Sequence, residues 1–324
     1  MNSLLNKITQ TFGVSGREDK VREVIEEKIK ELGLNPVTDN MGNVVVNISQ
    51  GKTKEKYLIS ANMDTIGVIV TFIEDNGFLR VGALGDFEAY KVANRLVVFQ
   101  NGVVGRCCLT KREGNVDDMY IDIGATSRES ALTLVSEGDT AAFKGESSFQ
   151  GKMIIGPNLS NRIGTCIILK ALENLVEKKA LDKISKDMTI AFTTQKNLSH
   201  RGARVLTHTV APDKVLVLDV EEAGDTIEGK GPLKLGKGLG LKVMDGNLIL
   251  HHEMKEELKA ISNNDLINIV SDKPTDGGIL QKEGKGAKVG VVAVPCRYTH
   301  TSEEVMSMED IEQGVQLLEK YLLA

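Results

Sequence analysis

Hydrophobic residues near the start of the chain follow two different periods. They first recur every three or four residues with charged residues between them, at Val21, Val24, Ile25, Ile29 and Leu32. This spacing predicts an amphipathic helix over residues 17–32. Residues 43–48 and 57–62 are short apolar runs that predict strands, and the second run is apolar throughout, as is typical of a strand covered on both faces. A helix followed by such strands indicates the beginning of an α/β sheet.

Residues 66–149 have a different pattern, with short β-type runs separated by turns. Asp-Asn-Gly at 75–77 and Asn-Gly at 101–102 are turn signals, and a single short helix is predicted over 127–135. The whole segment predicts a small β-barrel inserted into the first domain, because an insertion is tolerated where its two ends lie close together at a surface loop. The predicted boundaries are 1–65 and 154–324 for a discontinuous α/β domain, and 66–153 for the inserted barrel.

Strands and helices alternate again from residue 162. Helices are predicted over 163–177, 201–206, 253–262, 277–283 and 308–323, and strands over 188–193, 214–220, 266–270 and 288–295, with a hairpin turn at 245–247. This alternation predicts a mostly parallel sheet with helices on both faces. The predicted fold class is therefore α/β, with the small β-barrel as an insertion.

Composition narrows the classes of function. The chain has 324 residues, 41% of them hydrophobic, which is enough for about two packed domains. Its net charge of -5 lacks the basic excess that drives nucleic-acid binding, so we expect no nucleic-acid partner. No apolar run approaches the ~18 residues of a membrane span, and no long apolar leader begins the chain. Four cysteines without C-x-x-C spacing are typical of reduced thiols, so we expect a cytoplasmic protein without membrane contact.

Polar residues follow several of the predicted strands. In open α/β sheets, ligands bind outside the carboxyl ends of the strands, so these residues are candidates for a site. They are Asn62, Asp64, residues 194–197, Asp219 and residues 297–300, together with Ser160, Asn161 and Arg162 at the exit from the barrel. They converge on one edge of the predicted sheet, but no single residue among them is diagnostic of a reaction.

Six motifs occur in order along the chain and carry a resemblance. They are S-A-N-M-D-T-I-G (60–67), Y-I-D-I-G-A (120–125), N-L-S-N-R-I-G (158–164), T-T-Q-K-N-L-S-H-R-G-A (193–203), L-D-V-E-E-A-G-D-T (218–226) and V-P-C-R-Y-T-H-T (294–301). Over essentially its full length the chain resembles the tetrahedral, glutamyl and deblocking aminopeptidases, a family of dinuclear metallopeptidases. The resemblance implies a dimer formed through the inserted barrel, possible closure into a hollow twelve-subunit tetrahedron, and short peptides as ligands.

The resemblance also implies two zinc, cobalt or manganese ions with a carboxylate base. The family's metal ligands come from a His-x-Asp, an Asp-Asp-Arg, a Glu-Glu pair, a strand-end Asp and a late His. In this sequence only Asp219 and His300 match metal ligands of the family. The positions of the general-base Glu and of the metal-binding Glu beside it hold Lys196 and Asn197.

The two remaining ligand positions also depart from the family pattern. Asn62 stands where the His of His-x-Asp is expected, although its orienting partner Asp64 is kept. Ser160 stands where the bridging Asp is expected, with Asn161 beside it. Neutral hydroxyl and amide oxygens are poor ligands for these metals compared with carboxylate and imidazole.

These substitutions predict a degenerate metal site. We expect the Lys196 ammonium to replace one metal charge and to pair with Asp219, helped by hydrogen bonds from the Asn amides. The expected cofactor is none, or at most one weakly bound divalent ion. The predicted function is an aminopeptidase homologue without peptidase activity, in a structural, regulatory or peptide-binding role. The alternative is an active aminopeptidase with one ion on Asp219 and His300, or with Lys196 as a base of lowered pKa.

Simpler structural interpretations stay open for several residues. Asp219 and His300 can belong to a polar network, and Lys196 can be a solvated surface lysine. Asp276 in P-T-D-G-G lies near the site if the resemblance holds, but helix N-capping is the commoner reason for such a residue. Capping also explains His251-His252-Glu253, and we expect His200 and His208 to be unrelated to any site.

Overall fold

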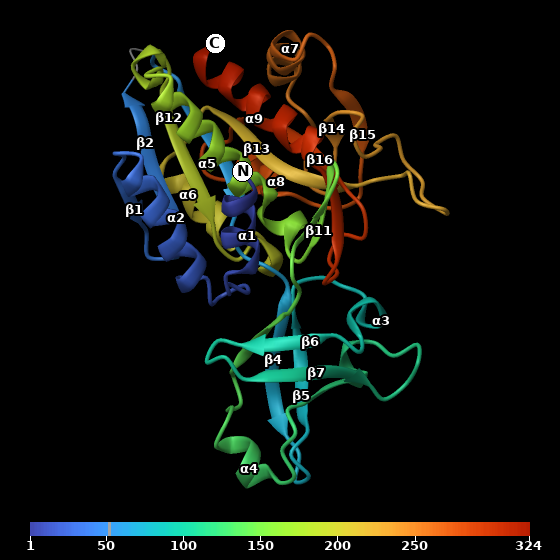
Figure 1. Ribbon diagram of the computed structural model, residues 1–324. Coiled ribbons are helices and arrows are strands. Elements are labelled where there is room, and N and C mark those ends of the chain that lie inside the picture. Colours follow the sequence, from blue (N-terminus) through green and yellow to red (C-terminus); the bar gives the residue numbers. More distant parts are fainter. Residues whose placement is uncertain (51–52) are drawn as a thin grey trace.

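The computed structural model describes residues 1–50 and 53–324, and it divides into an α/β domain and a β-barrel (Figure 1). The larger domain is built on an eight-stranded sheet in the order β1-β2-β12-β3-β13-β16-β14-β15. These strands are β1 (Pro36–Thr38), β2 (Val44–Gln50), β3 (Lys56–Asn62), β12 (Asp187–Thr193), β13 (Lys214–Glu222), β14 (Gly240–Met244), β15 (Ile267–Val270) and β16 (Lys288–Cys296). The four central strands, β12, β3, β13 and β16, are parallel to one another, which confirms the predicted mostly parallel sheet.

Helices cover both faces of this sheet. They are α1 (Asn2–Gln10), α2 (Asp19–Glu31), α5 (Leu159–Glu177), α6 (Arg201–Thr209), α7 (His252–Ile261), α8 (Asp276–Lys282) and α9 (Met308–Leu323). Alternate residues of each central strand face opposite layers. In β13, Leu216 and Leu218 pack in the core with α5 and α9, whereas Val215 and Val217 pack in a second core with α6 and α8. Both faces are therefore buried, which explains the unbroken apolar runs of the central strands.

Helix α5 lies unusually close to the sheet, at Gly164. A Cβ atom at this position would stand 2.6 Å from the carbonyl oxygen of Leu218 in β13 and 2.9 Å from the Cβ of Ala61 in β3. Glycine at 164 therefore permits the first turn of α5 to reach the carboxyl ends of β3 and β13.

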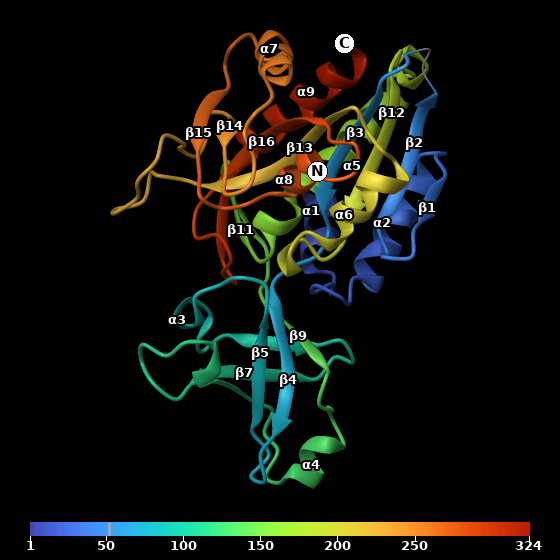
Figure 2. The same cartoon turned by 180° about the vertical axis from the view of Figure 1, so that it is seen from behind.

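The barrel closes in the order β4-β5-β8-β7-β6-β9 and lies below the α/β domain in Figures 1 and 2. Its strands are β4 (Gly67–Ile73), β5 (Leu79–Leu84), β6 (Leu96–Phe99), β7 (Val104–Leu109), β8 (Met119–Asp122) and β9 (Thr140–Phe143), with the short helices α3 (Ala89–Val92) and α4 (Arg128–Leu132). It has its own apolar core, which includes Val70, Phe99 and Ile121. The predicted inserted barrel is thus confirmed, and its domain boundaries stay predictions.

A small sheet joins the barrel exit to the α/β domain. Strands β10 (Ser148–Gln150) and β11 (Met153–Gly156) form a hairpin, and β11 pairs with β17 (Glu304–Ser307). The chain leaves the barrel through this hairpin and enters α5 directly, so β17 and the start of α5 lie together. The hairpin predicted at 245–247 forms as a single bridge between Met244 and Ile249.

No helix within residues 1–50 and 53–324 is long and apolar enough to cross a membrane.

Candidate functional site

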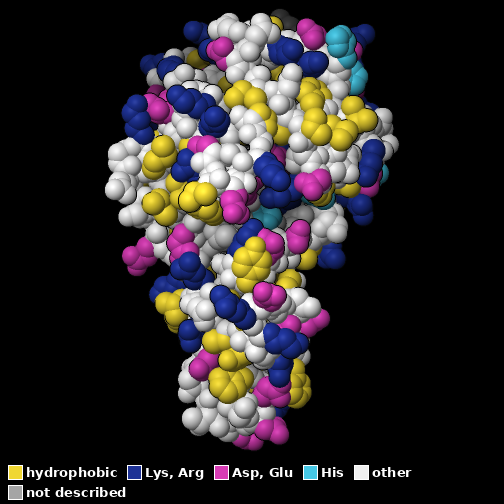
Figure 3. Space-filling view, turned by 90° about the vertical axis from the view of Figure 1, so that its right-hand side faces the viewer, with side chains coloured by type: hydrophobic (Ala, Val, Ile, Leu, Met, Phe, Trp, Pro, Cys, Tyr) yellow, Lys and Arg dark blue, Asp and Glu magenta, His cyan; other side chains and the backbone are white. Residues whose placement is uncertain are grey.

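A cavity of about 680 Å³ lies between the carboxyl ends of the parallel strands and a loop of the barrel. Five of the strand-end residues singled out in the sequence line it: Lys196, Asn197, Asp219, Thr299 and His300. The barrel adds Asp86, Phe87, Glu88 and Lys91 to its wall. Figure 3 shows basic, acidic and histidine side chains side by side at the waist between the two domains. The predicted convergence at this edge of the sheet therefore occurs, and it involves both domains.

Lys196 and Asp219 form a buried ion pair at the cavity. The Lys196 Nζ lies 2.6 Å from each carboxylate oxygen of Asp219, and the two side chains are 13% and 4% exposed. Burial by itself lowers the pKa of Lys196, but the charges of Asp219 and Asp276 outweigh it and the net pKa is raised. Burial likewise raises the pKa of Asp219, but Lys196 and Lys242 reverse the shift and lower it. Both groups are therefore charged at neutral pH, as the predicted ion pair requires.

Asp64 organises the loop that carries Lys196. Its Oδ1 accepts hydrogen bonds from the backbone N–H of Lys196 (3.1 Å) and from Asn62 Nδ2 (3.3 Å). Its Oδ2 accepts from the backbone N–H and the Nδ2 of Asn197, at 3.0 and 2.9 Å, and from the hydroxyl of Ser15. The amides of Asn62 and Asn197 thus donate to Asp64, and our expectation that they would support the Lys196–Asp219 pair is wrong. Asp64 is 0% exposed, so its carboxylate relies on these protein donors and not on water.

Ser160 contacts a carboxylate that the sequence analysis missed. Its backbone N–H donates to Glu304 at 2.6 Å, and its hydroxyl donates to the same carboxylate. Burial raises the pKa of Glu304 to about 7, although the bonds from Ser160 and from the backbone N–H of His300 (2.7 Å) oppose the shift. Asn161, beside Ser160 in the first turn of α5, is buried and does not line the cavity. Glu304 lies 144 residues from Ser160 and carries no motif, so the sequence offered no signal for it.

His300 is oriented by the barrel. Its Nδ1 donates to the backbone carbonyl of Asp86 at 2.7 Å, because a carbonyl can only accept. Burial lowers the pKa of His300, and the charges of Lys196 and Lys273 add to the shift. The neutral imidazole therefore keeps its Nε2 as a free acceptor or ligand atom.

Asp276 anchors a second histidine at the cavity. It is the first residue of α8, but its carboxylate accepts from the hydroxyl of Thr193 at 2.6 Å and contacts His200 Nδ1 at 2.8 Å. N-capping is therefore not its role, since the N-cap residue is Thr275. His200 lines the cavity, so the expectation that it is unrelated to a site is wrong. The side chain of His251, by contrast, accepts from the backbone N–H of Glu253 and caps α7 as predicted.

Carboxylate and imidazole groups line the cavity, but among the described residues they are not grouped as a metal site would require. Within the described part of the chain, no three His, Cys, Asp or Glu side chains are grouped so as to hold a metal ion. Of the five predicted ligand positions, only Asp219 and His300 offer a carboxylate or an imidazole, and Lys196 already engages both oxygens of Asp219.

Comparisons with known proteins identify the family. A sequence model of the M42 glutamyl aminopeptidases matches residues 42–317. The chain belongs to the M42 family. A candidate aminopeptidase of Acetivibrio thermocellus is 37% identical to this M42 protein over 328 residues, covering 98% of this chain and 97% of the relative. The lysyl aminopeptidase of Pyrococcus furiosus is 26% identical over 342 residues, covering 98% and 96%.

A solved structure supports the same conclusion. The TET1 peptidase of Pyrococcus horikoshii, which can assemble into a tetrahedron or a large octahedral shell, superposes on this M42 chain with a TM-score of 0.88. The two are 28% identical, and the match covers 99% of this chain and 98% of the other. Because the likeness includes the barrel, the insertion is part of the shared fold.

Proposed function

We propose that this protein is an M42 aminopeptidase homologue that has lost its two-metal site and its peptidase activity. It keeps the cavity and acts as a peptide-binding, structural or regulatory subunit. The observation that carries the proposal is the Lys196 ammonium, which lies 2.6 Å from both oxygens of Asp219 at the position of the expected base.

The side chains at the site do not fit two divalent ions. Carboxylates are missing at positions 160, 196 and 197, where Ser, Lys and Asn stand, and an imidazole is missing at 62. An ammonium about 4 Å from a divalent ion is repelled by roughly 8 kcal/mol of gross Coulomb energy at an effective dielectric of ~20. Repulsion of this size offsets the contribution of an ordinary ligand, and no remaining group at these positions can act as the carboxylate base.

The single-ion alternative meets the same obstacle. An ion on Asp219 and His300 has to displace Lys196 from Asp219, which leaves a buried ammonium without its partner. Removing one partner of a buried pair costs about 3–5 kcal/mol. A lysine base is disfavoured as well, because the pKa of Lys196 is raised rather than lowered.

The cavity itself is suited to a short peptide. Its volume of about 680 Å³ lies within the range of roughly 300–1,000 Å³ that is usual for small-molecule sites. The relatives are named for aminopeptidase activity and one of them assembles into closed shells, which supports a peptide ligand and self-association for this chain. Four buried thiols are compatible with the reducing cytoplasm, where we place the protein.

Metal analysis and an aminopeptidase assay test the proposal. After dialysis against zinc, cobalt or manganese buffers, we expect fewer than one tightly bound ion per chain and no hydrolysis of aminoacyl or short-peptide substrates. Two bound ions per chain would overturn the proposal. So would hydrolysis that is lost in Asp219→Asn or His300→Ala, and in that case the single-ion alternative holds.

A restored variant provides the positive control. The quadruple change Asn62→His, Ser160→Asp, Lys196→Glu and Asn197→Glu supplies the missing ligands and base. Because Ser160 contacts Glu304, the new carboxylate at 160 faces another one, so the variant is purified with metal present. The same variant carrying Asp219→Asn is the matched control. Hydrolysis by the restored variant alone supports the proposal, and equal activity in the natural chain contradicts it.

A further inference from the structure

A loop with an apolar tip projects from the end of β13. Residues 224–235 leave the sheet after Glu222, and Ile227 at the tip is fully exposed. In Figures 1 and 2 this loop extends away from the α/β domain beyond β15. Residues 227–232 of its tip, Ile-Glu-Gly-Lys-Gly-Pro, are all exposed. An exposed isoleucine at the end of a projecting loop is a feature that a partner can bury.

The base of this loop is held firmly. Asp225 accepts two hydrogen bonds from Arg297, at 2.8 Å from Nε and 2.6 Å from an Nη atom. The backbone N–H of Gly224 donates to the carbonyl of Leu233 at 2.8 Å, which closes the base, and Leu233 itself is buried. The tip is therefore presented on a fixed base, so that little conformational entropy remains to be lost at the base when the tip binds.

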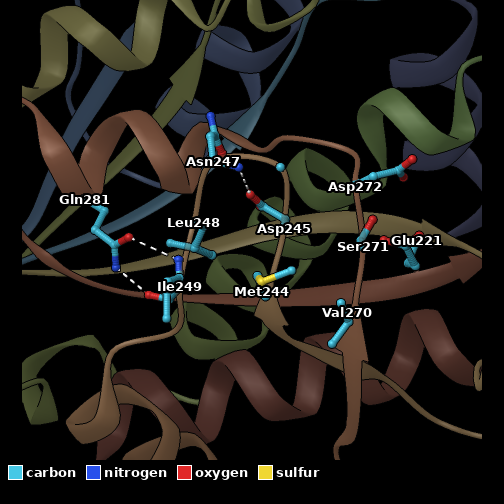
Figure 4. A pocket seen from close by; sticks show the side chains of 11 residues that line it. Glu221, Met244, Asp245, Asn247, Leu248, Ile249, Val270, Ser271, Asp272 and Gln281 are labelled. Atoms are coloured by element: carbon cyan, nitrogen blue, oxygen red, sulfur yellow. Dashed lines mark hydrogen bonds between the residues drawn. The ribbon is translucent and has the colours of Figure 1, made fainter.

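A hollow of about 930 Å³ lies near the root of this loop, since Glu221 at the end of β13 lines it, and Figure 4 shows its lining side chains. Three of its lining residues are large, apolar and exposed: Met244 (44%), Ile249 (70%) and Val270 (68%). The side chain of Gln281 accepts from the backbone N–H of Ile249 at 3.2 Å and donates to its C=O at 2.6 Å, and thereby holds this segment in place. Figure 3, which faces the side on which the loop projects, shows hydrophobic patches on the upper domain with charged side chains between them.

The charges of the two features are complementary. The hollow is lined by three carboxylates, Glu221, Asp245 and Asp272, and by no lysine or arginine among the described residues. Glu221 is paired with Lys242, and Asp245 is buried, so Asp272 is the acidic group most open to a partner. Residues 224–235 carry two exposed lysines, Lys230 in the tip and Lys234 after it, and two acidic residues, Glu228 and Asp225, of which Asp225 is paired with Arg297. An apolar tip with two exposed lysines near it thus matches an apolar hollow with an open carboxylate, Asp272, at its rim.

We propose that the hollow binds the 226–232 loop of a second copy of this chain. Because Glu221 at the end of β13 lines the hollow and the loop starts just after it, the root of the loop lies beside the hollow while the tip points away. Two copies related by a twofold axis can therefore exchange tips, so that each Ile227 enters the other copy's hollow.

One loop in one hollow is a small contact. Stable interfaces bury about 1,200–2,000 Å², so the exchange works together with another surface that holds the copies. It is independent of the proposed loss of catalysis, because neither the loop nor the apolar residues of the hollow belong to the polar network of Lys196 and Asp219.

Cysteine cross-linking tests the contact directly. All four natural cysteines are buried, so an introduced exposed cysteine reacts without background. Purified full-length Ile227→Cys is mixed with Ile249→Cys and oxidised mildly, so that any disulfide between the two sites joins different chains. We expect at least fivefold more cross-linked dimer than in a mixture of Ile227→Cys with Val37→Cys. Val37 is equally open to solvent but lies on β1, at the opposite edge of the sheet.

Two results would overturn the proposal. One is that Ile227→Cys cross-links equally well with Ile249→Cys and with Val37→Cys. The other is that Ile227→Cys cross-links with itself more strongly than with Ile249→Cys, which indicates contact between two tips. Mass photometry of Ile227→Asp gives a second measurement. The exposed position leaves folding intact, and we expect the mean assembly mass to fall at least twofold relative to the natural chain and to Val37→Asp. An unchanged mass also counts against the contact.

Discussion

The energetic coupling between Lys196 and Asp219 is the most direct prediction of the site's structure. We consider Lys196→Met, which removes the ammonium and keeps the length of the side chain, together with Asp219→Asn and the double variant. Two unit charges 2.6 Å apart attract by about 6 kcal/mol of gross Coulomb energy at an effective dielectric of ~20. Desolvation of both groups consumes much of this energy, so the net value has to be measured.

The expected pattern follows from burial. Each single variant leaves a charge buried without its partner, and such changes cost about 3–5 kcal/mol of unfolding free energy. The double variant leaves no unpaired charge, so we expect it to be more stable than the sum of the single effects by at least about 2 kcal/mol. Asp276 lies near enough to raise the pKa of Lys196, so Lys196→Met loses that favourable interaction too.

Urea unfolding followed by far-ultraviolet circular dichroism measures the four stabilities, because the chain has no tryptophan for fluorescence. Protein concentration is held constant, since self-association shifts apparent stability. The control is the same cycle on the surface pair Lys7–Glu27, whose atoms are 2.8 Å apart with side chains 53% and 60% exposed; we expect no measurable coupling there. If the effects of the Lys196 and Asp219 substitutions on the unfolding free energy are additive, as we expect for this surface pair, Lys196 does not substitute for a metal charge. The argument for the site is then refuted.

Three further predictions concern groups around the site. Burial and Asp64 raise the pKa of Glu18 from 4.5 to about 7, so between these values the native state holds a proton that the unfolded chain has released, and stability falls as pH rises. Glu18→Gln keeps the Oε1 that accepts from the backbone N–H groups of Gly16 and Gln195. In urea titrations we expect the variant and the natural chain to be equally stable near pH 4.5, and the variant to be more stable by about 3 kcal/mol above pH 7. Parallel pH profiles of the two proteins would contradict this. Arg162→Met leaves the carbonyls of Ile8, Gly13 and Met63 without their buried donor. We expect the unfolding free energy to fall by more than about 3 kcal/mol and the N-terminal amides to exchange hydrogen early, whereas a fall below about 1 kcal/mol would contradict this role of Arg162. Gly164→Ala adds a Cβ 2.6 Å from the carbonyl oxygen of Leu218. We expect the melting temperature to fall because of this clash, although alanine favours helices more than glycine does. A rise in melting temperature would show that α5 can move away from the sheet.

The architecture could be predicted because its signals are local and periodic. Unbroken apolar runs along β13 and β16 distinguish the buried parallel strands from the half-exposed strands of the barrel, and Asn-Gly turns mark the barrel hairpins. The Lys196–Asp219 pair could be predicted only through the family resemblance, which puts both residues at positions of the expected metal site; the sheet order β12-β3-β13 then brings them together.

Other parts of the site had no such signal. Glu304 reaches Ser160 across 144 residues, and His200 reaches Asp276 across 76, through folding contacts that no motif encodes. The direction of the Asn62 and Asn197 amides depends on the turn after β12, where Gln195 adopts a left-handed backbone conformation with φ 51°. After this turn the backbone N–H groups of Lys196 and Asn197 both donate to Asp64, and the side-chain amide of Asn197 donates to the same carboxylate.

The barrel loop that walls the cavity has a consequence for regulation. Residues 86–91 belong to the barrel, and the carbonyl of Asp86 fixes His300 on the α/β side of the cavity. Any partner that shifts this loop by gripping the barrel changes the affinity of the cavity for its ligand. By thermodynamic reciprocity, a ligand in the cavity changes the affinity of the barrel for that partner by the same factor. Whether or not the site catalyses a reaction, it can thus transmit a signal, with ligand occupancy measured as a change in assembly.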